Sequence, residues 1–356
     1  MESNKEICGM LDLVIRPGFC VKENKIVSLN SAAEGLLLVP GTDIRTLLLT
    51  GAEEYASFES GCLYLKLALS AKGCGASVTK VDGWDVFVLD QASDDGELRA
   101  MALAARELRE PLTNVMITAD RLFPLTALQD DDQTKQQVAR LNRGLFQMLR
   151  IIGNMSDAER CAAVSRQETL NIPALLEEVF EKAEALVAHT GIPLTYTGLD
   201  QPVYSLADGE QLERAVLNIL SNAIKFTPKG GTIAGKLTRR GRMLQLSIQD
   251  SGSGIAENVR SSVFARYLRQ PTLEDSRYGI GLGMVLVRSA AAHHGGTVLI
   301  DQPEGQGTRI TMTLAIRQSK DTTLRSNVLR VDYAGERDHG LIELSDCLPL
   351  ELYGLE

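Results

Sequence analysis

The sequence has little histidine: it contains four, and none precedes His189. A haem ligated by histidine is therefore excluded from residues 1–92. Long apolar runs are also lacking, since nothing approaches the roughly 18 residues that cross a bilayer. The first ten residues, MESNKEICGM, carry acidic side chains and no apolar centre, unlike a signal peptide. These absences predict a cytoplasmic protein without a membrane span.

Paired cysteines and an excess of positive charge are absent as well. The six cysteines are scattered without C-x-x-C pairs, which disfavours disulfides and a zinc site. The net charge of −9 argues against nucleic acid or an anionic membrane as the main partner. The content of 44% hydrophobic and 23% charged residues is typical of a globular protein, and 356 residues predict two or three domains.

Residues 1–92 have the pattern of a small α+β domain. GFCVKENKIVSLN alternates apolar and polar residues around a turn, which predicts a hairpin. SAAEGLLLVPG and IRTLLLTGAEEY indicate short helices, and LYLKLALSAKGCGASVTKVDGWDVFVLD contains three strand-like runs. This order of elements resembles a PAS sensor domain. No flavin-binding cysteine signature is present, so a spacer without a ligand is as good an interpretation as a ligand sensor.

Residues 93–162 predict an antiparallel hairpin of two long helices. In each helix, apolar residues recur at spacings of three and four, the a/d pattern of a helical bundle. A hairpin cannot bury both apolar seams by itself, so we expect a homodimeric four-helix bundle through residues 93–162. A hairpin that packs only on its own domain is the alternative. The first seam comprises Leu98, Met101, Ala105, Leu108, Leu112, Val115, Ala119 and Leu122, and the second Val138, Leu141, Leu145, Met148, Ile152 and Met155.

Residues 163–316 predict an α/β domain. NIPALLEEVFEKAEALVAHTG has a proline near its first turn and a glycine just past its end, as a helix often does. DGEQLERAVLNILSNAIKFTPKGG predicts a second amphipathic helix. Strand-like runs surround them: IPLTYTG, GTIAGKLTRR, MLQLSIQD, GGTVLID and TRITMTLAI. Residues 317–356 form a polar extension of unknown role with one or two strand-like runs, VLRVDYA and GLIEL.

The second helix carries a polar stripe beside its apolar one. Asn218, Asn222 and Lys225 lie at i, i+4 and i+7, so two amides and an ammonium share one face. Amide oxygens can bind Mg²⁺ or its waters, and lysine pairs with phosphate oxygens. The stripe is therefore a candidate ligand-binding face.

A strand followed by D-S-G-S-G offers a second group of ligand-binding residues. The Asp250 carboxylate can accept a hydrogen bond from an exocyclic amine, and Gly252 and Gly254 let a base approach the backbone. GQGTRITMTL then places Gly307 and Thr308 at the start of a later strand.

Glycines also precede a helix in YGIGLGMVLV. Gly279, Gly281, Leu282 and Gly283 lie at its start. Glycines at a helix N-terminus present N–H groups and the positive end of the helix dipole to phosphates. Each of these patterns alone is common, but their order along the chain is specific.

Together these segments resemble the Bergerat-type ATP-binding domain that sensor histidine kinases, gyrase, Hsp90 and MutL share. The matching segments are NILSNAIKFT, the D-x-G-x-G, the phenylalanine box VFARYLR, the G-x-G-L-G and the final G-T. The resemblance to sensor histidine kinases covers residues 94–316 and implies an α/β-sandwich that binds ATP with Mg²⁺. It implies that Asn222 is the metal ligand, that Asn218 and Lys225 lie near phosphates, that Asp250 contacts adenine, and that residues 255–282 form a mobile lid.

One position distinguishes branches of this superfamily. The ATP-hydrolysing members carry a glutamate one helical turn before the metal-binding asparagine, where it activates a nucleophile. Here Asn218 occupies that position, and an amide cannot take up the proton. The histidine-kinase branch is therefore favoured.

The first helix of the hairpin departs from the family at the phosphoacceptor. Family members often read H-E-L-R-T-P-L, whereas this chain reads R-E-L-R-E-P-L, with Arg106 in place of the histidine and Glu107 and Pro111 matching. Arginine stays protonated and has no nucleophilic lone pair. Pro111 frees the carbonyl of Glu107 and loosens the helix. Since Arg106 cannot accept the phosphate, the sequence predicts that autophosphorylation by the usual route is lost.

Glu110 departs from the family too. A threonine or asparagine at this place orients the water that dephosphorylates a response regulator, whereas a second carboxylate repels a phospho-aspartate. Arg106 and Glu110 are spaced i, i+4 and can pair, which is worth about 0.3–0.5 kcal/mol.

These observations predict an ATP-binding, sensor-histidine-kinase-like protein that signals by conformation in a two-component-type pathway. A response regulator or a second kinase is the expected partner. Two alternatives stay open: an active kinase that phosphorylates a histidine or other acceptor on a partner in trans, and a nucleotide-free scaffold.

Overall fold

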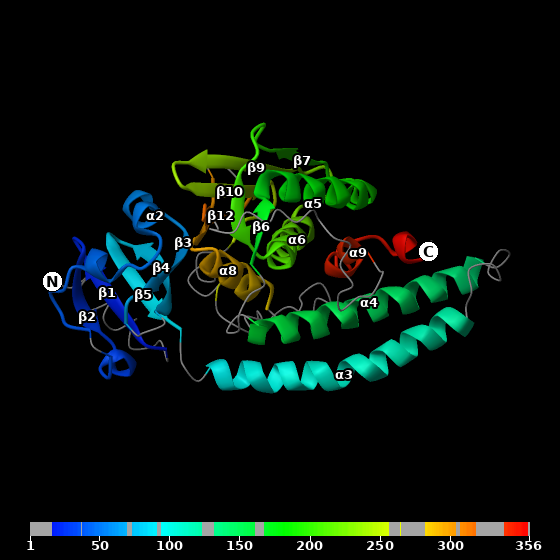
Figure 1. Ribbon diagram of the computed structural model, residues 1–356, viewed down its shortest axis with the longest axis horizontal. Helices are drawn as coiled ribbons and strands as arrows, with labels where there is room; N and C mark the ends of the chain where they lie inside the picture. Colours follow the sequence, from blue (N-terminus) through cyan, green and yellow to red (C-terminus); the bar gives the residue numbers. More distant parts are fainter. Residues whose placement is uncertain are drawn as a thin grey trace.

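The computed structural model describes residues 16–36, 38–69, 73–90, 94–122, 132–160, 167–255, 264, 282–303, 307–317 and 338–354. It has an N-terminal α+β block, a hairpin of two long helices and an α/β domain, with α4 lying between α3 and the α/β domain (Figure 1). The predicted α+β multidomain architecture with a helical hairpin is confirmed. The boundaries at residues 92, 162 and 316 stay predictions.

The N-terminal block has the predicted order of two strands, short helices and three strands. Its first hairpin turns at Glu23 and Asn24, whose φ angles of 51° and 64° suit the tight turns that match strand twist. Phe19 and Phe87 stack in its core with ring centroids 4.6 Å apart. Its elements are β1 (Gly18–Lys22), β2 (Lys25–Leu29), η1 (Ser31–Ala33), η2 (Ile44–Leu47), α2 (Ala52–Ser57), β3 (Cys62–Leu67), β4 (Cys74–Val81) and β5 (Trp84–Leu89), in the sheet order β2-β1-β5-β4-β3.

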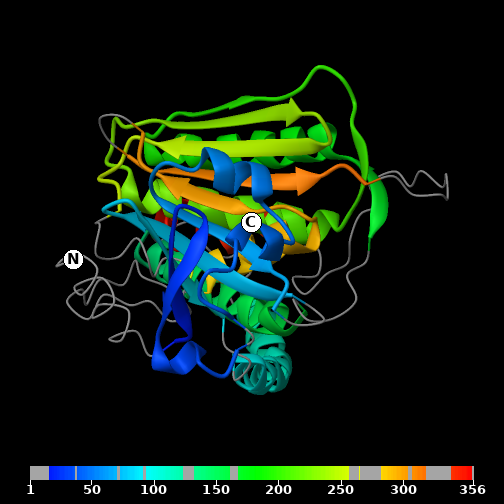
Figure 2. The same ribbon diagram turned by 90° about the vertical axis from the view of Figure 1, so that its left-hand side faces the viewer.

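The α/β domain contains the predicted strands and helices. Helices α5, α6 and α8 lie on one face of its sheet, which has the order β7-β9-β10-β12-β11 (Figure 2). The sequence did not predict β6 and β8, strands of four residues each that pair in a separate sheet. The elements are β6 (Glu168–Asn171), α5 (Ile172–Val187), η4 (Ala188–Thr190), β7 (Leu194–Thr197), β8 (Tyr204–Ala207), α6 (Gly209–Phe226), β9 (Ile233–Arg240), β10 (Met243–Asp250), α8 (Gly283–His293), β11 (Val298–Asp301) and β12 (Arg309–Ala315).

Strands β3 and β11 join these two blocks in one ten-stranded sheet. Each strand would otherwise leave a row of unpaired backbone groups at a sheet edge. Gly61 permits the approach, because a Cβ there would lie 2.1 Å from the carbonyl oxygen of Ile300. Beside the junction, Arg288 Nη1 donates to Asp90 Oδ1 at 2.6 Å, and its guanidinium lies 4.9 Å from the centre of the Tyr64 ring. The N-terminal block is thus tied to the α/β domain through backbone and side chains.

Helices α3 (Asp94–Leu122) and α4 (Asp132–Arg160) form the hairpin, with Pro111 inside α3. The hairpin buries only part of each predicted seam, because only one stripe of apolar side chains on each helix packs against neighbouring elements of the same chain. Among the seam residues, those buried are Ala105, Leu112, Ala119, Val138, Leu145 and Ile152, while those exposed are Leu108, Val115, Leu122, Leu141 and Met148. Among the residues that the structure describes, no helix is long and apolar enough to span a bilayer.

The C-terminal segment packs between the hairpin and the α/β domain as α9 (His339–Glu343) and η5 (Leu350–Tyr353) (Figure 1). The prediction of a strand-like GLIEL is wrong, since this stretch belongs mostly to α9. Asp338 caps that helix by accepting hydrogen bonds from the backbone N–H groups of Gly340 and Leu341, and the apolar side chains that follow are buried against α4 and α6. The other run, VLRVDYA, lies outside the described residues.

Candidate nucleotide-binding site

Helix α6 presents the polar stripe that the sequence indicated. Asp208 begins the helix by accepting a hydrogen bond from the backbone N–H of Gln211 at 3.1 Å. The apolar stripe of α6 is buried in the core. Arg214, Asn218, Ser221 and Lys225 follow one another at i, i+4, i+7 and i+11, so they share one face next to the core.

Asn218 lies against the first turn of α8. Its Nδ2 donates to the carbonyl oxygen of Arg214 at 2.9 Å, and the residue is 1% exposed. A Cβ at Gly283 would lie 2.8 Å from Asn218 Oδ1, so a glycine at this point lets α8 approach the amide. Leu282, the preceding residue, is buried. Asn222 lies one turn further along α6 and is partly exposed.

Asp250 and Thr308 come together at the ends of β10 and β12. Asp250 Oδ1 accepts hydrogen bonds from the backbone N–H groups of Gly252 at 2.8 Å and Thr308 at 3.1 Å. Burial raises the pKa of Asp250, while these two hydrogen bonds act in the opposite direction. The carboxylate is therefore fixed in orientation at the edge of the core.

Glycines bring the backbone of this motif close to its neighbours. A Cβ at Gly252 would lie 2.3 Å from the carbonyl oxygen of Phe226, at the end of α6. Gly307 has a φ of +91°, and a Cβ there would lie 1.9 Å from the carbonyl oxygen of Asp250. Gly254 also has a positive φ, of +74°. The D-x-G-x-G and G-T segments thus meet beside α6, whereas Gly279, Gly281 and most of the expected lid lie outside the described residues.

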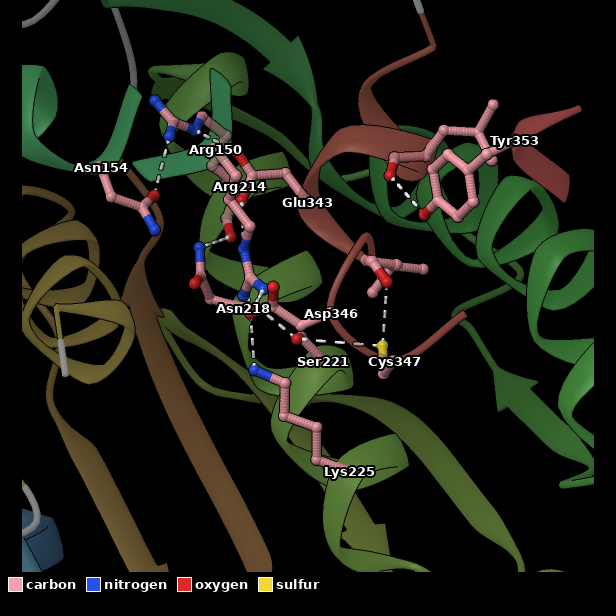
Figure 3. A network of polar contacts seen from close by, with 12 residues as sticks. Arg150, Asn154, Arg214, Asn218, Ser221, Lys225, Glu343, Asp346, Cys347 and Tyr353 are labelled. Atoms are coloured by element: carbon pink, nitrogen blue, oxygen red, sulfur yellow. Dashed lines mark hydrogen bonds and ion pairs between the residues drawn. The ribbon is translucent and has the colours of Figure 1, made fainter. Parts of the chain in front are cut away.

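Lys225 has a partner that the sequence did not reveal. Its Nζ donates to Asp346 Oδ2 at 2.9 Å (Figure 3). Burial and the nearby Arg150 lower the pKa of Lys225. Burial alone would raise the pKa of Asp346, but Arg150 and Lys225 together lower it, so we assign an ionised carboxylate. No local pattern could have found this pair, because the two residues are 121 positions apart.

A second buried pair lies about three turns earlier on α6. Arg214 Nε donates to Glu343 Oε1 at 3.0 Å, and its Nη2 donates to Asn154 Oδ1 at 3.0 Å. The side chains of Arg214 and Glu343 are 3% and 0% exposed. Arg150 joins the two pairs into one network between α4, α6 and the C-terminal segment, because its Nη1 donates to Asp346 Oδ2 at 2.5 Å and its Nε lies 3.6 Å from Glu343 Oε2 (Figure 3). Its Nη2 also donates to Ser221 Oγ at 3.1 Å.

The residues around the expected phosphoacceptor lie in a different environment. Arg106, Glu107 and Glu110 are exposed on α3, the helix that α4 separates from the α/β domain (Figure 1). In the part of the chain that the structure describes, Arg106 and Glu110 do not form the ion pair that their spacing allows. These residues lie on the first helix of the hairpin, as the sequence predicts, and their role in phosphate transfer stays a prediction.

Comparison with known proteins agrees with this geometry. Residues 207–318 match the family described as histidine kinase-, DNA gyrase B- and HSP90-like ATPase. The chain carries a histidine kinase-like ATPase domain. The match begins at the last residue of β8 and contains α6, β10, α8 and β12, the elements that bring Asn218, Asp250 and Thr308 together.

Over a longer region the chain is similar to sensor histidine kinases. It is 28% identical over 274 residues to an uncharacterised sensor-like histidine kinase of Rhizobium meliloti, covering 72% of this chain and 52% of that protein. It is 30% identical over 224 residues to the adaptive-response sensory kinase SasA of Synechocystis, covering 61% of this chain and 58% of that protein. The chain therefore spans little more than half the length of these relatives.

A solved structure supports the fold. Full-length ShkA in complex with AMPPNP superposes with a TM-score of 0.50 at 23% identity, over 62% of this chain and 46% of that one. At this identity the likeness concerns the fold alone.

Proposed function

We propose that this protein binds ATP with Mg²⁺ at the face of α6 and signals through conformation, as a cytoplasmic homodimer in a two-component-type pathway. The observation that carries the proposal is the meeting of Asp250, Gly252 and Thr308 beside α6, within a histidine kinase-like ATPase domain. A response regulator or a second kinase is the proposed partner.

The residues at this face fit a nucleotide. An amine of adenine can donate to the Asp250 carboxylate, which two backbone N–H groups hold in place. Asn222 offers an amide oxygen at a partly exposed position, and Mg²⁺ commonly takes one or two protein ligands besides phosphate oxygens and waters. When bound, the ion would neutralise phosphate charge. Lys225 supplies a cation one turn away for the phosphates.

The exposed part of the hairpin supports a homodimer. Leu108, Val115 and Leu122 are spaced by seven residues on α3 and are 50%, 50% and 67% exposed. Leu141 and Met148 repeat this spacing on α4 and are also exposed. A seven-residue repeat of apolar side chains is the pattern that a second hairpin covers in a four-helix bundle.

Conformational signalling follows from two features. Arg106 stands where the phosphoacceptor is expected and has no lone pair to attack a phosphate. The N-terminal block, which we propose to be a PAS-like sensor, is paired to the ATPase domain through β3 and β11. A signal that shifts this block can therefore shift the nucleotide-binding domain relative to the hairpin.

Calorimetric titration of Mg-ATP tests the proposal. We expect saturable binding by the wild-type protein, a loss of at least tenfold in affinity in Asn222→Ala, and no change in Asn114→Ala, a matched variant on exposed α3. Equal affinities in the two variants would move the metal-binding role away from Asn222. Absence of binding in folded protein would support the nucleotide-free scaffold.

Transfer of labelled phosphate tests the remaining alternative, an active kinase that phosphorylates a partner in trans. We expect no label on the wild-type hairpin after incubation with γ-labelled ATP. Label on an added second kinase or response regulator, on a histidine or another acceptor, would instead favour an active kinase that works in trans.

A further inference from the structure

We propose that the C-terminal strap, residues 338–354, is an intramolecular competitor of the nucleotide. Its Asp346 carboxylate occupies the anion position between Lys225 and Arg150 that a nucleotide phosphate would take (Figure 3). The inference rests on the proposed ATP site at the face of α6 and adds a regulatory contact to it.

The geometry around Asp346 is that of a bound anion. Asp346 Oδ2 accepts from Lys225 Nζ at 2.9 Å and from Arg150 Nη1 at 2.5 Å. The side chains of both cations are only 8% exposed, so the strap shields them from solvent. A single oxygen between an ammonium and a guanidinium is also how proteins bind a phosphate oxygen. The two anions therefore cannot use Lys225 at the same time.

The charges on the two sides of the interface between the strap and the helices would allow a polyanion to take the place of the strap. Helices α4 and α6 direct Arg143, Arg150, Arg214 and Lys225 at the strap, whereas the strap contributes the carboxylates of Glu343 and Asp346. Arg143 bonds to strap carbonyl oxygens, those of Ser345 at 3.0 Å and Asp346 at 3.3 Å. Like charges in so small a volume disfavour one another unless an anion lies between them. A nucleoside triphosphate carries several negative charges, so together with its Mg²⁺ it can replace the strap carboxylates here.

Apolar contacts hold the strap on either side of Asp346. Leu341 and Ile342 are buried before it, and Leu348 and Tyr353 after it. Tyr353 packs on Phe146 of α4 with ring centroids 5.5 Å apart, and its hydroxyl donates to the carbonyl oxygen of Leu341 at 3.0 Å. The Asp346 turn is thus pressed onto α6 by anchors that do not depend on its charge. Substituting Asp346 alone should leave the anchors in place.

Strap docking and nucleotide binding are then linked equilibria. The apparent association constant for the nucleotide equals the intrinsic constant multiplied by the fraction of molecules whose Lys225 is not bound to Asp346. Whatever draws the strap away raises nucleotide affinity, and bound nucleotide loosens the strap by the same factor.

Titration of Mg-ATP into the full chain tests this competition with a matched pair of variants. Asp346→Asn removes the carboxylate with little change in size, and we expect a roughly tenfold lower Kd than in the wild type. Glu351→Gln removes an exposed carboxylate of the same strap, and we expect the wild-type Kd. Equal Kd values in all three proteins would overturn the competition and leave the proposed ATP site standing.

Hydrogen exchange of the unaltered protein gives a second readout that does not depend on a variant folding. Exchange in residues 341–349 should rise when Mg-ATP is added at saturation. Binding of ATP with unchanged exchange there would overturn the strap proposal. A failure of ATP to bind wild type, Asp346→Asn and Glu351→Gln alike would overturn the proposed function itself, whereas binding by Asp346→Asn alone would support both.

Discussion

The chain carries two charged stripes on helices, and their environments are opposite. On α3, Arg106, Glu107 and Glu110 face solvent. On α6, Arg214 and Lys225 are covered by the strap, with side chains 3% and 8% exposed. Charges interact weakly in water and strongly where water is excluded. Similar residue types therefore have little structural effect on α3 and fix the position of a whole segment on α6.

This difference also bears on how well each stripe tolerates substitution. An exposed position tolerates exchange of one residue for another at little cost in stability. An arginine at position 106 therefore needs no compensating change around it, because its side chain is exposed and forms no ion pair with Glu110. The α6 stripe is different: Arg214 has a buried acidic partner, and a change on either side leaves a charge without its counter-charge.

The largest effect is expected where the buried stripe is broken. Glu343→Ala leaves Arg214 and Arg150, which lie 3.0 and 3.6 Å from its carboxylate, without that counter-charge in a buried site. We expect a loss of about 3–5 kcal/mol in the free energy of unfolding, measured by urea denaturation. The control Glu351→Ala, on the exposed side of the strap, should change it by less than about 0.5 kcal/mol. Similar losses in both variants would show that the burial of the network does not matter.

A smaller, pH-dependent effect is expected at His294, which holds the start of α6. Its Nε2 accepts from the backbone N–H of Asp208 at 3.0 Å and its Nδ1 donates to the carbonyl oxygen of Ala290 at 2.7 Å, so the ring is neutral. Burial lowers the pKa of His294 below its usual 6.5. The contribution of His294 to the free energy of unfolding is therefore full above pH 6.5. It is lost as the pH falls from 6.5 through the lowered pKa, at a slope of at most about 1.4 kcal/mol per pH unit.

The measurement is the free energy of unfolding between pH 7 and pH 5. His294→Gln should flatten this part of the profile, whereas His189→Gln, at an exposed position, should leave its slope unchanged. A profile that keeps its slope in His294→Gln would assign the titration to another group.

These contrasts show which parts of the molecule a sequence can reveal. The periodicity of the sequence predicted α6 and its polar face, because Asn218 and Lys225 are seven residues apart and therefore share one face of the helix. Motif order brought Asp250 and Thr308 into one site, since each lies where a strand ends or begins. The Lys225–Asp346 pair and the β3–β11 junction escaped prediction because they join segments more than one hundred residues apart, and nothing local encodes them.

The hairpin shows a subtler limit. The spacing of three and four predicts one apolar seam, yet Leu112 is buried while Leu108 and Val115, one turn to either side, are half exposed. A heptad pattern states which residues are apolar but not which neighbour covers each of them. Within one chain, α4 covers one stripe of α3, and the other stripe needs the proposed second hairpin.

The smallest effect is expected at Arg106 itself. Arg106→Ala removes an exposed side chain that forms no ion pair with Glu110, so the free energy of unfolding should change by less than about 0.5 kcal/mol. Arg214→Ala, the matched change on α6, should cost several times more, because Glu343 would keep its buried charge without that partner. Urea denaturation at several protein concentrations checks both. A loss above about 1 kcal/mol in Arg106→Ala that grows on dilution would place Arg106 in a contact between hairpins, because the stability of a dimer depends on concentration. The exposed stripe would then be a binding surface rather than a solvated one.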